Sequence, residues 1–144
     1  MRLSNTTAAI SSAGLTVQLQ LFALTTSSLT TDIPILSVAG YLDLLLTNNS
    51  QSLTVNLYSS TGAVARQIVF NNYIFRYRFW SNYSITVNTT AVSLFADGTL
   101  VRSFTHSVTL PSTATNLTIS NPQGLSYLIS GVLVADSKFK IAFN

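Results

Sequence analysis

The chain has no cysteine and no glutamate, and only 8% of its 144 residues are charged. The absence of cysteine excludes disulfide bonds, thiolate zinc sites and thiol catalysis. The only acidic residues are four aspartates, which are a small supply for calcium, since calcium needs several oxygen ligands. They are equally few for a glycosidase, which needs two carboxyl groups facing one cleft. We therefore expect no cofactor, no metal ion and no enzymatic activity.

Positive charge is also scarce, and it is scattered along the chain. Seven Lys or Arg residues give a net charge of +3, without the basic cluster typical of nucleic-acid-binding proteins. No uninterrupted apolar run reaches the ~18 residues of a membrane span. The first residues are polar where a cleavable signal peptide needs an apolar segment. The sequence thus predicts no nucleic-acid partner and no membrane span. It shows no cleavable export signal, so we expect either that such a signal was removed or that the protein is not exported by that route.

What the chain does contain is 47% apolar residues, arranged in short runs that alternate with Ser, Thr, Asn and Gln. Alternation with a period of two indicates a β-strand with one buried face. The runs are also rich in the β-branched and aromatic residues that strands favour. They cover Leu15–Leu21, Leu53–Leu57, Tyr73–Trp80, Tyr83–Asn88, Val92–Ala96, Leu117–Ile119 and Phe139–Phe143, with Leu100 and Arg102 following the fifth.

Turn-forming residues separate these runs at intervals of about 8–12 residues, which favours an all-β sandwich or barrel. The clearest signal is Asp97-Gly98, because a two-residue hairpin loop needs residues that tolerate positive φ. The other turns are predicted at Asn48–Ser50, Ser60–Gly62, Asn71–Asn72 and Asn121–Gly124. We expect residues 1–13 to be a flexible or partner-dependent arm and residues 14–144 to form one sandwich domain.

The segment from Phe79 to Val101 resembles the centre of laminin-G-like domains, which are members of the concanavalin A-like lectin sandwiches. In that family a Trp precedes an alternating strand, and the next strand ends in Asp-Gly. The matching residues are Trp80, Tyr83, Ile85, Val87, Val92, Leu94, Phe95, Asp97, Gly98 and Val101. The similarity extends over residues 37–143 and implies a single antiparallel β-sandwich of jelly-roll type. Calcium is common on the rim of such domains, but neither Asp43 nor Asp136 lies in a matching motif.

The run Tyr73–Tyr83 combines aromatic and basic residues. One interpretation is structural: one face of the strand is core, and the Arg stems of the other pack on aromatic rings. The other is functional, since aromatic residues and Arg are enriched at interface hot spots and aromatic faces stack on sugar rings. The candidate residues for binding or for a subunit interface are Tyr73, Arg76, Arg78 and Trp80. The single histidine, His106, has no catalytic motif around it and is interpreted as a surface or packing residue.

Five Asn-x-Ser/Thr sequons occur in the chain, and such sites are N-glycosylated only in secreted or surface proteins. The candidate asparagines are Asn5, Asn48, Asn82, Asn88 and Asn116. A chain this rich in Asn, Ser and Thr also produces sequons by chance, so both interpretations stay open.

Two functions fit these features. The first is a non-enzymatic structural subunit of a virion coat, spike or fibre, or of an extracellular assembly, held by self-association and with host attachment as a second role. In that case the arm and the run beginning at Leu15 would pair with a neighbouring subunit's sheet edge. The alternative is a monomeric lectin-like or adhesion module that binds cell-surface glycan. Both place the protein on a virion or an extracellular surface.

Overall fold

The structure is a computed structural model of the chain. It describes the backbone of residues 2–3, 8–9, 14–23, 33–46, 52–71, 80–111, 113–114, 117–119, 127–136 and 139–143. Side chains are described for residues 14–20, 34–45, 52–71 and 80–111. The described residues contain no helix, and so none that is long and apolar enough to cross a membrane.

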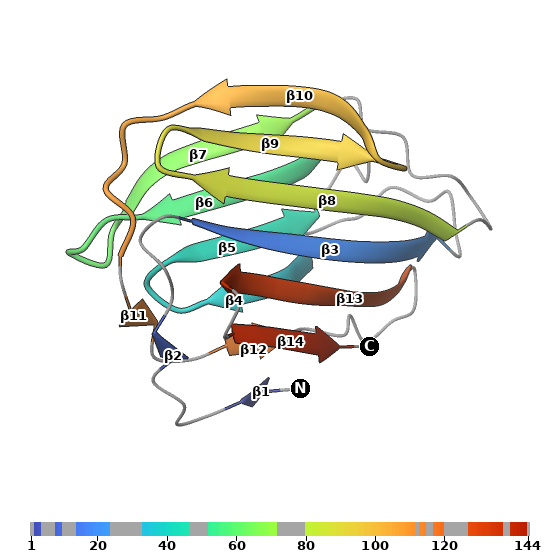
Figure 1. The fold of residues 1–144 in the computed structure, drawn as a ribbon, viewed down its shortest axis with the longest axis horizontal. Helices are drawn as coiled ribbons and strands as arrows, with labels where there is room; N and C mark the ends of the chain where they lie inside the picture. The colour runs from blue at the N-terminus through green and yellow to red at the C-terminus, as the bar shows by residue number, and fades with distance from the viewer. Residues whose placement is uncertain are drawn as a thin grey trace.

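Two antiparallel sheets lie one behind the other (Figure 1). The front sheet has the order β10 (Thr99–Thr105), β9 (Ala91–Ala96), β8 (Trp80–Asn88), β3 (Gly14–Ala23), β13 (Tyr127–Asp136) and β14 (Phe139–Phe143). The back sheet has the order β1 (Arg2–Leu3), β12 (Leu117–Ile119), β4 (Ile33–Val38), β5 (Leu42–Leu46), β6 (Leu53–Tyr58) and β7 (Val64–Phe70). A short pair joins β2 (Ala8–Ala9) to β11 (Thr113–Ala114). The predicted all-β jelly-roll sandwich is confirmed.

The core lies between the two sheets, and the predicted alternation accounts for much of it. In residues 15–20 of β3, in β8 and in residues 91–95 of β9, every second residue is buried, and the polar residues between them are partly or fully exposed. The buried apolar residues are Leu15, Val17, Leu19, Ile35, Leu36, Val38, Tyr41, Leu42, Leu44, Leu53, Val55, Leu57, Ile68, Phe70, Tyr83, Ile85, Val87, Val92, Leu94 and Leu110. Burying a side chain of this size stabilises the fold by about 1.5–3 kcal/mol before entropy is counted, so this cluster is the main source of stability.

The Asp97-Gly98 hairpin forms as predicted. Both residues have positive φ, 46° at Asp97 and 81° at Gly98, which is the geometry of a type I′ turn. The Asp97 N–H donates to the Asn82 carbonyl oxygen at 2.9 Å, and the carboxylate accepts from the Asn82 N–H at 3.3 Å. The turn is therefore tied to the neighbouring strand β8. The turn predicted at Ser60–Gly62 is also present, between β6 and β7.

Gly14 lies where the backbone of β8 leaves no room for a side chain. It opens β3 opposite Asn88 of β8, and its φ is 128°. A Cβ atom at this position would lie 1.9 Å from the carbonyl oxygen of Val87. Only glycine fits there, because an L side chain rarely adopts this φ and the space is already filled by backbone.

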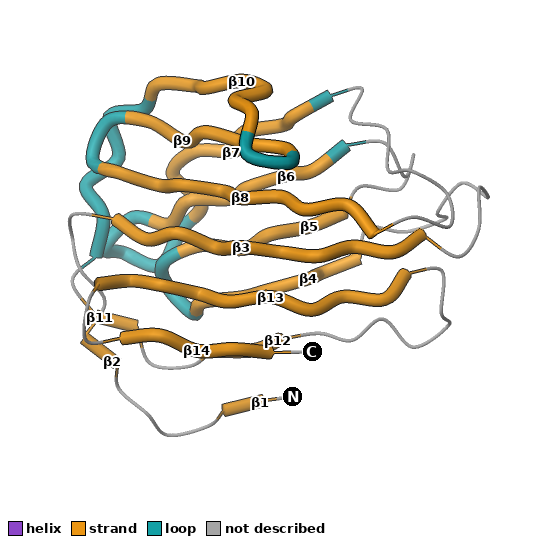
Figure 2. The backbone as a smooth tube through the Cα atoms, turned by 45° about the vertical axis from the view of Figure 1, so that its right-hand side comes forward, coloured by secondary structure: helices purple, strands orange, loops and turns teal. Residues whose placement is uncertain are grey.

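The two sheets meet along one edge, where β7 and β10 are the last described strands of their sheets (Figure 2). The Phe70 and Phe104 rings pack edge to face with centroids 5.4 Å apart. A bulge between Leu100 and Arg102 shifts the register, so that Arg102 lies opposite the buried Leu94. Its guanidinium lies 4.7 Å from the centre of the Phe104 ring. A regular strand would place Leu100 and Arg102 on one face, and the bulge places them on opposite faces.

Other predictions meet the structure less directly. The run beginning at Leu15 does not lie at a sheet edge, because β3 is paired with β8 on one side and with β13 on the other. The predicted pairing of this run with a neighbouring subunit is therefore wrong. Within residues 1–13, β1 pairs with β12 and β2 with β11, and the division into arm and domain stays a prediction. Residues 72–79 and the turns at Asn48–Ser50 and Asn121–Gly124 lie outside the described residues.

Candidate functional site

The outward side of β3, β8, β9 and β10 is a broad polar surface, which we call the neutral face. Strand alternation creates it, since the same period that sends Leu, Val and Ile into the core sends the residues between them to the other side. Its described members are Thr16, Gln18, Gln20, Asn82, Ser84, Thr86, Ser93, Phe95, Leu100 and Ser103. All of them are partly or fully exposed.

The strand register arranges these side chains in rows that cross the strands. Within these four strands, one row carries hydroxyl groups, from Thr16, Thr86, Ser93 and Ser103. The next row carries Gln18, Ser84, Phe95 and Leu100. Residues directly opposite each other lie about 4.5–5.5 Å apart, so neighbouring groups can contact one ligand. The Ser93 and Ser103 hydroxyls are in fact hydrogen-bonded at 2.8 Å.

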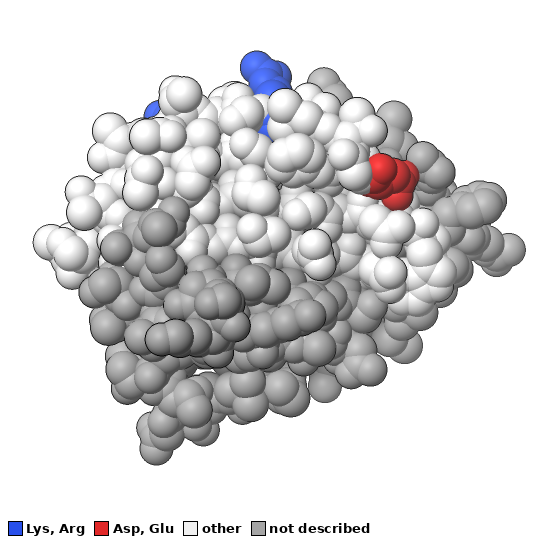
Figure 3. Space-filling model, in the orientation of Figure 1, with Lys and Arg blue, Asp and Glu red and all other residues white. Residues whose placement is uncertain are grey.

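Among the described side chains of β3, β8, β9 and β10, the neutral face has many hydrogen-bonding groups and no charge. The register continues the hydroxyl row through Val134 of β13 to Lys140 of β14. Figure 3 shows this side of the molecule, where the described surface is white except for blue near the upper margin and red at the right. The nearest carboxylate by sequence is Asp97 in the β9–β10 turn, and the Asn82 amide donates to its oxygen at 3.5 Å. A surface of this kind can donate to and accept from a hydroxylated ligand without attracting ions.

Trp80 stands beside the neutral face. It is the first residue of β8 and lies two residues before Asn82, which places both side chains on the same side of the strand. The Trp80 side chain is 50% exposed. A half-exposed indole offers a flat apolar ring next to polar groups. Of the other predicted binding residues, Tyr73, Arg76 and Arg78 lie outside the described residues, so the predicted cluster stays a prediction.

Two of the five predicted glycosylation sites are described, and both are exposed. Asn82 lies within β8, where its side-chain amide is engaged with Asp97. Asn88 ends β8, and its side-chain oxygen accepts from the Thr90 N–H at 2.9 Å and the Ala91 N–H at 2.8 Å. Asn5, Asn48 and Asn116 are outside the described residues, and glycosylation stays a prediction at all five.

His106 follows β10, and its ring links the end of β8 to the segment after β10 through two hydrogen bonds. Its Nε2 lies 2.8 Å from the Asn88 carbonyl oxygen, and its Nδ1 accepts from the Val108 N–H at 3.1 Å. The ring is therefore the Nε2–H tautomer, with both nitrogens engaged. This agrees with the packing role expected from the sequence. Within the described part of the chain, no group of three His, Cys, Asp or Glu residues could hold a metal ion.

A second polar cluster, which sequence reasoning missed, lies on the back sheet. Asp43 of β5 accepts hydrogen bonds from the Ser37 hydroxyl and the Tyr58 hydroxyl, each at 2.5 Å and each on a different carboxylate oxygen. The hydrogen bond to Asp43 raises the pKa of Tyr58 to about 12, because only the protonated phenol can donate it; burial and the Asp43 charge add to the effect. Each Asp43 carboxylate oxygen already accepts a hydrogen bond within the cluster, so we assign the cluster a structural role. The alternation of the sequence is enough to predict that Ser37 and Asp43 face outward. The contact with Tyr58 depends on the order of strands β4, β5 and β6, which the sequence pattern does not give.

No protein-family model matches the chain, and no curated protein sequence matches it either. Among solved structures it is similar to the binding domain of botulinum neurotoxin DC in complex with rat synaptotagmin II, with a TM-score of 0.61 and 12% identity over 85% of this chain and 32% of that one. It is also similar to a structure described by the statement that cell entry of botulinum neurotoxin type C is dependent upon interaction with two ganglioside molecules. The TM-score is 0.58 and the identity 10%, over 85% of this chain and 32% of that one.

Sheep galectin-11, in complex with glycerol, gives a TM-score of 0.53 and 10% identity over 98% of both chains. The chain thus spans about a third of the toxin chains but almost the whole galectin. At 10–12% identity the likeness concerns the fold. The protein therefore has the lectin-like β-sandwich fold of the concanavalin A type, as its resemblance to that group implied.

Proposed function

We propose that this protein is a non-enzymatic recognition module that binds an uncharged glycan on the neutral face, with Trp80 stacked against a sugar ring. The observation that carries the proposal is the pair of uncharged rows together with a half-exposed indole on the same side of β8, with the Gln20–Asn82 pair between them. A sugar presents hydroxyl groups that both donate and accept, together with an apolar C–H face that packs on an aromatic ring. The neutral face offers the matching groups in the same arrangement.

The fold and the neighbouring structures support this proposal. A galectin shares the fold over its full length, and one of the similar toxins depends on ganglioside molecules, which carry sugars. A glycan ligand also fits a protein at an extracellular or virion surface. The described carboxylates, Asp43 and Asp97, belong to different sheets, an arrangement that does not provide the facing pair of a glycosidase.

The test is a glycan-binding screen followed by titration with the strongest neutral ligand. We expect Trp80→Ala to weaken binding about tenfold or more, because it removes the stacking surface. Gln18→Ala should weaken it as well, since that amide lies in the middle of the second row. The matched control is Gln67→Ala, which removes an exposed amide from the back sheet. A screen without any ligand, or three variants that bind like the parent protein, would contradict the proposal.

A second candidate function is a structural subunit of a virion coat, spike or fibre, and a specific observation favours it. The neighbouring edge strands expose three large apolar side chains, with Val64 at 50%, Leu100 at 53% and Val101 at 44%. Unpaired sheet edges are templates for pairing with another chain, which charges on the strand oppose. Each of these two strands carries a single charged residue, Arg66 in β7 and Arg102 in β10. In this interpretation copies associate through the β7–β10 edge, and the neutral face provides host attachment.

Light scattering coupled to size-exclusion chromatography tests this second function. We expect an oligomer for the parent chain and a monomer for Val101→Lys, because a lysine on an edge strand opposes pairing. Thr89→Lys adds the same charge at an exposed position in the β8–β9 turn and should leave the oligomer intact. If the parent protein is itself a monomer at all accessible concentrations, the structural function is wrong and glycan recognition alone remains.

A further inference from the structure

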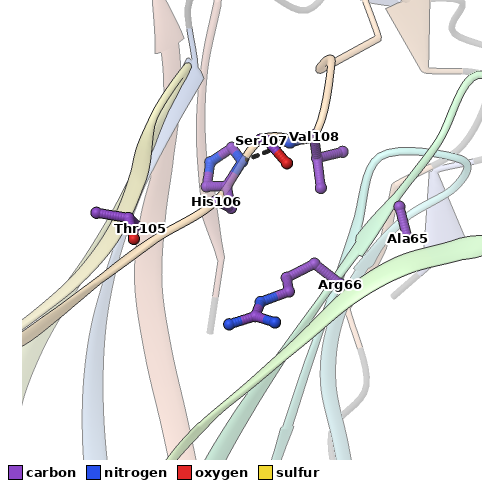
Figure 4. Close-up of a pocket in the computed structure, with 6 residues that line it drawn as sticks. All are labelled: Ala65, Arg66, Thr105, His106, Ser107 and Val108. Carbon is purple, nitrogen blue, oxygen red and sulfur yellow. Dashed lines mark hydrogen bonds between the residues drawn. The ribbon is translucent and has the colours of Figure 1, made fainter.

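A cleft of about 490 Å³ lies between the beginning of β7 and the segment that follows β10. Its walls are formed by Ala65, Arg66, Thr105, His106, Ser107 and Val108 (Figure 4). The two walls are far apart in sequence and come together because β7 and β10 are neighbouring edges of the two sheets. None of these six residues belongs to the neutral face, so the cleft is a separate site.

Arg66 supplies the charge of this cleft. Its side chain extends from β7 into the space faced by His106 and Ser107 (Figure 4). Within the described part of the chain it makes no ion pair and no hydrogen bond, in contrast to Arg102, which is stacked on Phe104. The guanidinium therefore has its donors available. Its planar fork is suited to two parallel hydrogen bonds with a carboxylate or sulfate group.

The opposite wall adds neutral donors. The side-chain hydroxyls of Thr105 and Ser107 are exposed and have no partner among the described residues. His106 is held between Asn88 and Val108, so that its ring forms a fixed wall. None of the described residues that line the cleft is acidic. A guanidinium without a partner among the described residues, in a cleft that also holds the Ser107 hydroxyl and whose described lining has no carboxylate, is complementary to an oxyanion.

We infer that this cleft binds the carboxylate or sulfate group of an acidic saccharide. The size of the cleft lies within the range of about 300–1,000 Å³ that is usual for small-ligand sites. The saccharide part of the inference rests on the proposed glycan recognition, whereas the oxyanion part rests only on the cleft. A sialylated and a sulfated sugar present the same chemistry to Arg66, and so does free sulfate.

The experiment uses the full chain labelled with ¹⁵N and follows the side-chain Nε–H signal of Arg66 by NMR. The probes are inorganic sulfate, a sialylated trisaccharide, a singly sulfated disaccharide and the neutral disaccharide that the trisaccharide contains. We expect the Arg66 signal to shift and saturate with the three acidic probes and to stay unchanged with the neutral one. Comparing the affinities of the sialylated and the sulfated sugar shows whether the cleft prefers a carboxylate or a sulfate group.

Substitutions then distinguish specific binding at Arg66 from attraction of acidic ligands to the overall positive charge of the protein. Arg66→Gln should weaken binding of the acidic sugars about tenfold, because a charge-assisted bidentate contact is lost. Arg66→Lys keeps the charge but not the fork, and should lose several-fold. The matched control is Arg102→Gln, which removes the same charge from the same edge of the sandwich and should leave binding unchanged. Thermal unfolding of each variant checks that it is folded.

The outcomes distinguish this inference from the proposed function. Saturable sulfate binding at Arg66 without binding of any sugar supports the cleft and overturns glycan recognition. Binding of neutral and acidic sugars with equal affinity, and with no response at Arg66, overturns the cleft and leaves glycan recognition standing. Equal losses for Arg66→Gln and Arg102→Gln also overturn the cleft, because they indicate attraction to overall positive charge.

Discussion

Replacing Gly14 with alanine is expected to destabilise the protein by about 4 kcal/mol or more, which is enough to unfold a typical domain of this size. The added Cβ would lie 1.9 Å from the Val87 carbonyl oxygen, 2.8 Å from the Val87 carbonyl carbon and 2.9 Å from the Asn88 Cα. All three are backbone atoms of β8, so no side chain can rotate away. Relief requires β3 to move away from β8, which breaks hydrogen bonds in the centre of the front sheet.

The matched control for this substitution is Gly62→Ala. Gly62 also has a positive φ, 83°, but a Cβ there would meet no atom within 4 Å. Its expected cost is about 1–2 kcal/mol, which is the backbone term alone. Urea unfolding of both variants measures the difference in their free energies of unfolding. If Gly14→Ala is insoluble while Gly62→Ala is soluble, that result also indicates that the Gly14 substitution is the more destabilising one. Equal stabilities would show that β3 and β8 are not as close as the structure has them.

The second large effect is a loss of stability at alkaline pH. Burial raises the pKa of Tyr41 to about 12, and the hydrogen bond to Asp43 raises that of Tyr58 to about 12. An unfolded chain releases these protons near pH 10, so it binds fewer protons than the folded protein between about pH 10 and pH 12. The stabilisation is complete below pH 10 and is lost as the pH rises towards 12. For the buried Tyr41 alone the loss is about 3 kcal/mol.

Urea unfolding at about pH 9 and at about pH 12, together with tyrosinate absorbance, measures this effect. Tyr58→Phe should lower stability at pH 9, since it leaves one Asp43 oxygen without its donor. The same variant should lose less stability than the parent protein on going to high pH, because one titrating group is gone. A variant that loses as much as the parent would assign the alkaline transition to other groups.

The sequence was sufficient for strands that bury one face and expose the other. The alternation in β3, β8 and β9 is regular, and the Asp97-Gly98 turn has the residues that its φ angles require. β4 escaped the pattern because a bulge between Pro34 and Leu36 lets Ile35 and Leu36 be buried in succession. β7 escaped it because the strand lies at an edge, where its first four residues are all exposed.

The sequence predicts which side chains of the candidate site face outward, but it does not predict which of them lie next to each other. Alternation indicates that Thr16 and Thr86 face outward, but only the register shows that they lie in one row with Ser93. The cleft was beyond sequence reasoning, since nothing local links Arg66 to His106. The two residues meet because strands at the ends of two different sheets share one edge of the sandwich.

The position of β3 has a consequence for the order of folding events. β3 is near the beginning of the chain, but its partners are β8 and β13, and β13 lies near the end. The centre of the front sheet therefore consists of non-local contacts, which slow folding in all-β proteins to the range of about milliseconds to seconds. During synthesis on the ribosome, β3 must wait for β13 with one edge unpaired. We expect the nascent chain to depend on chaperones during that interval.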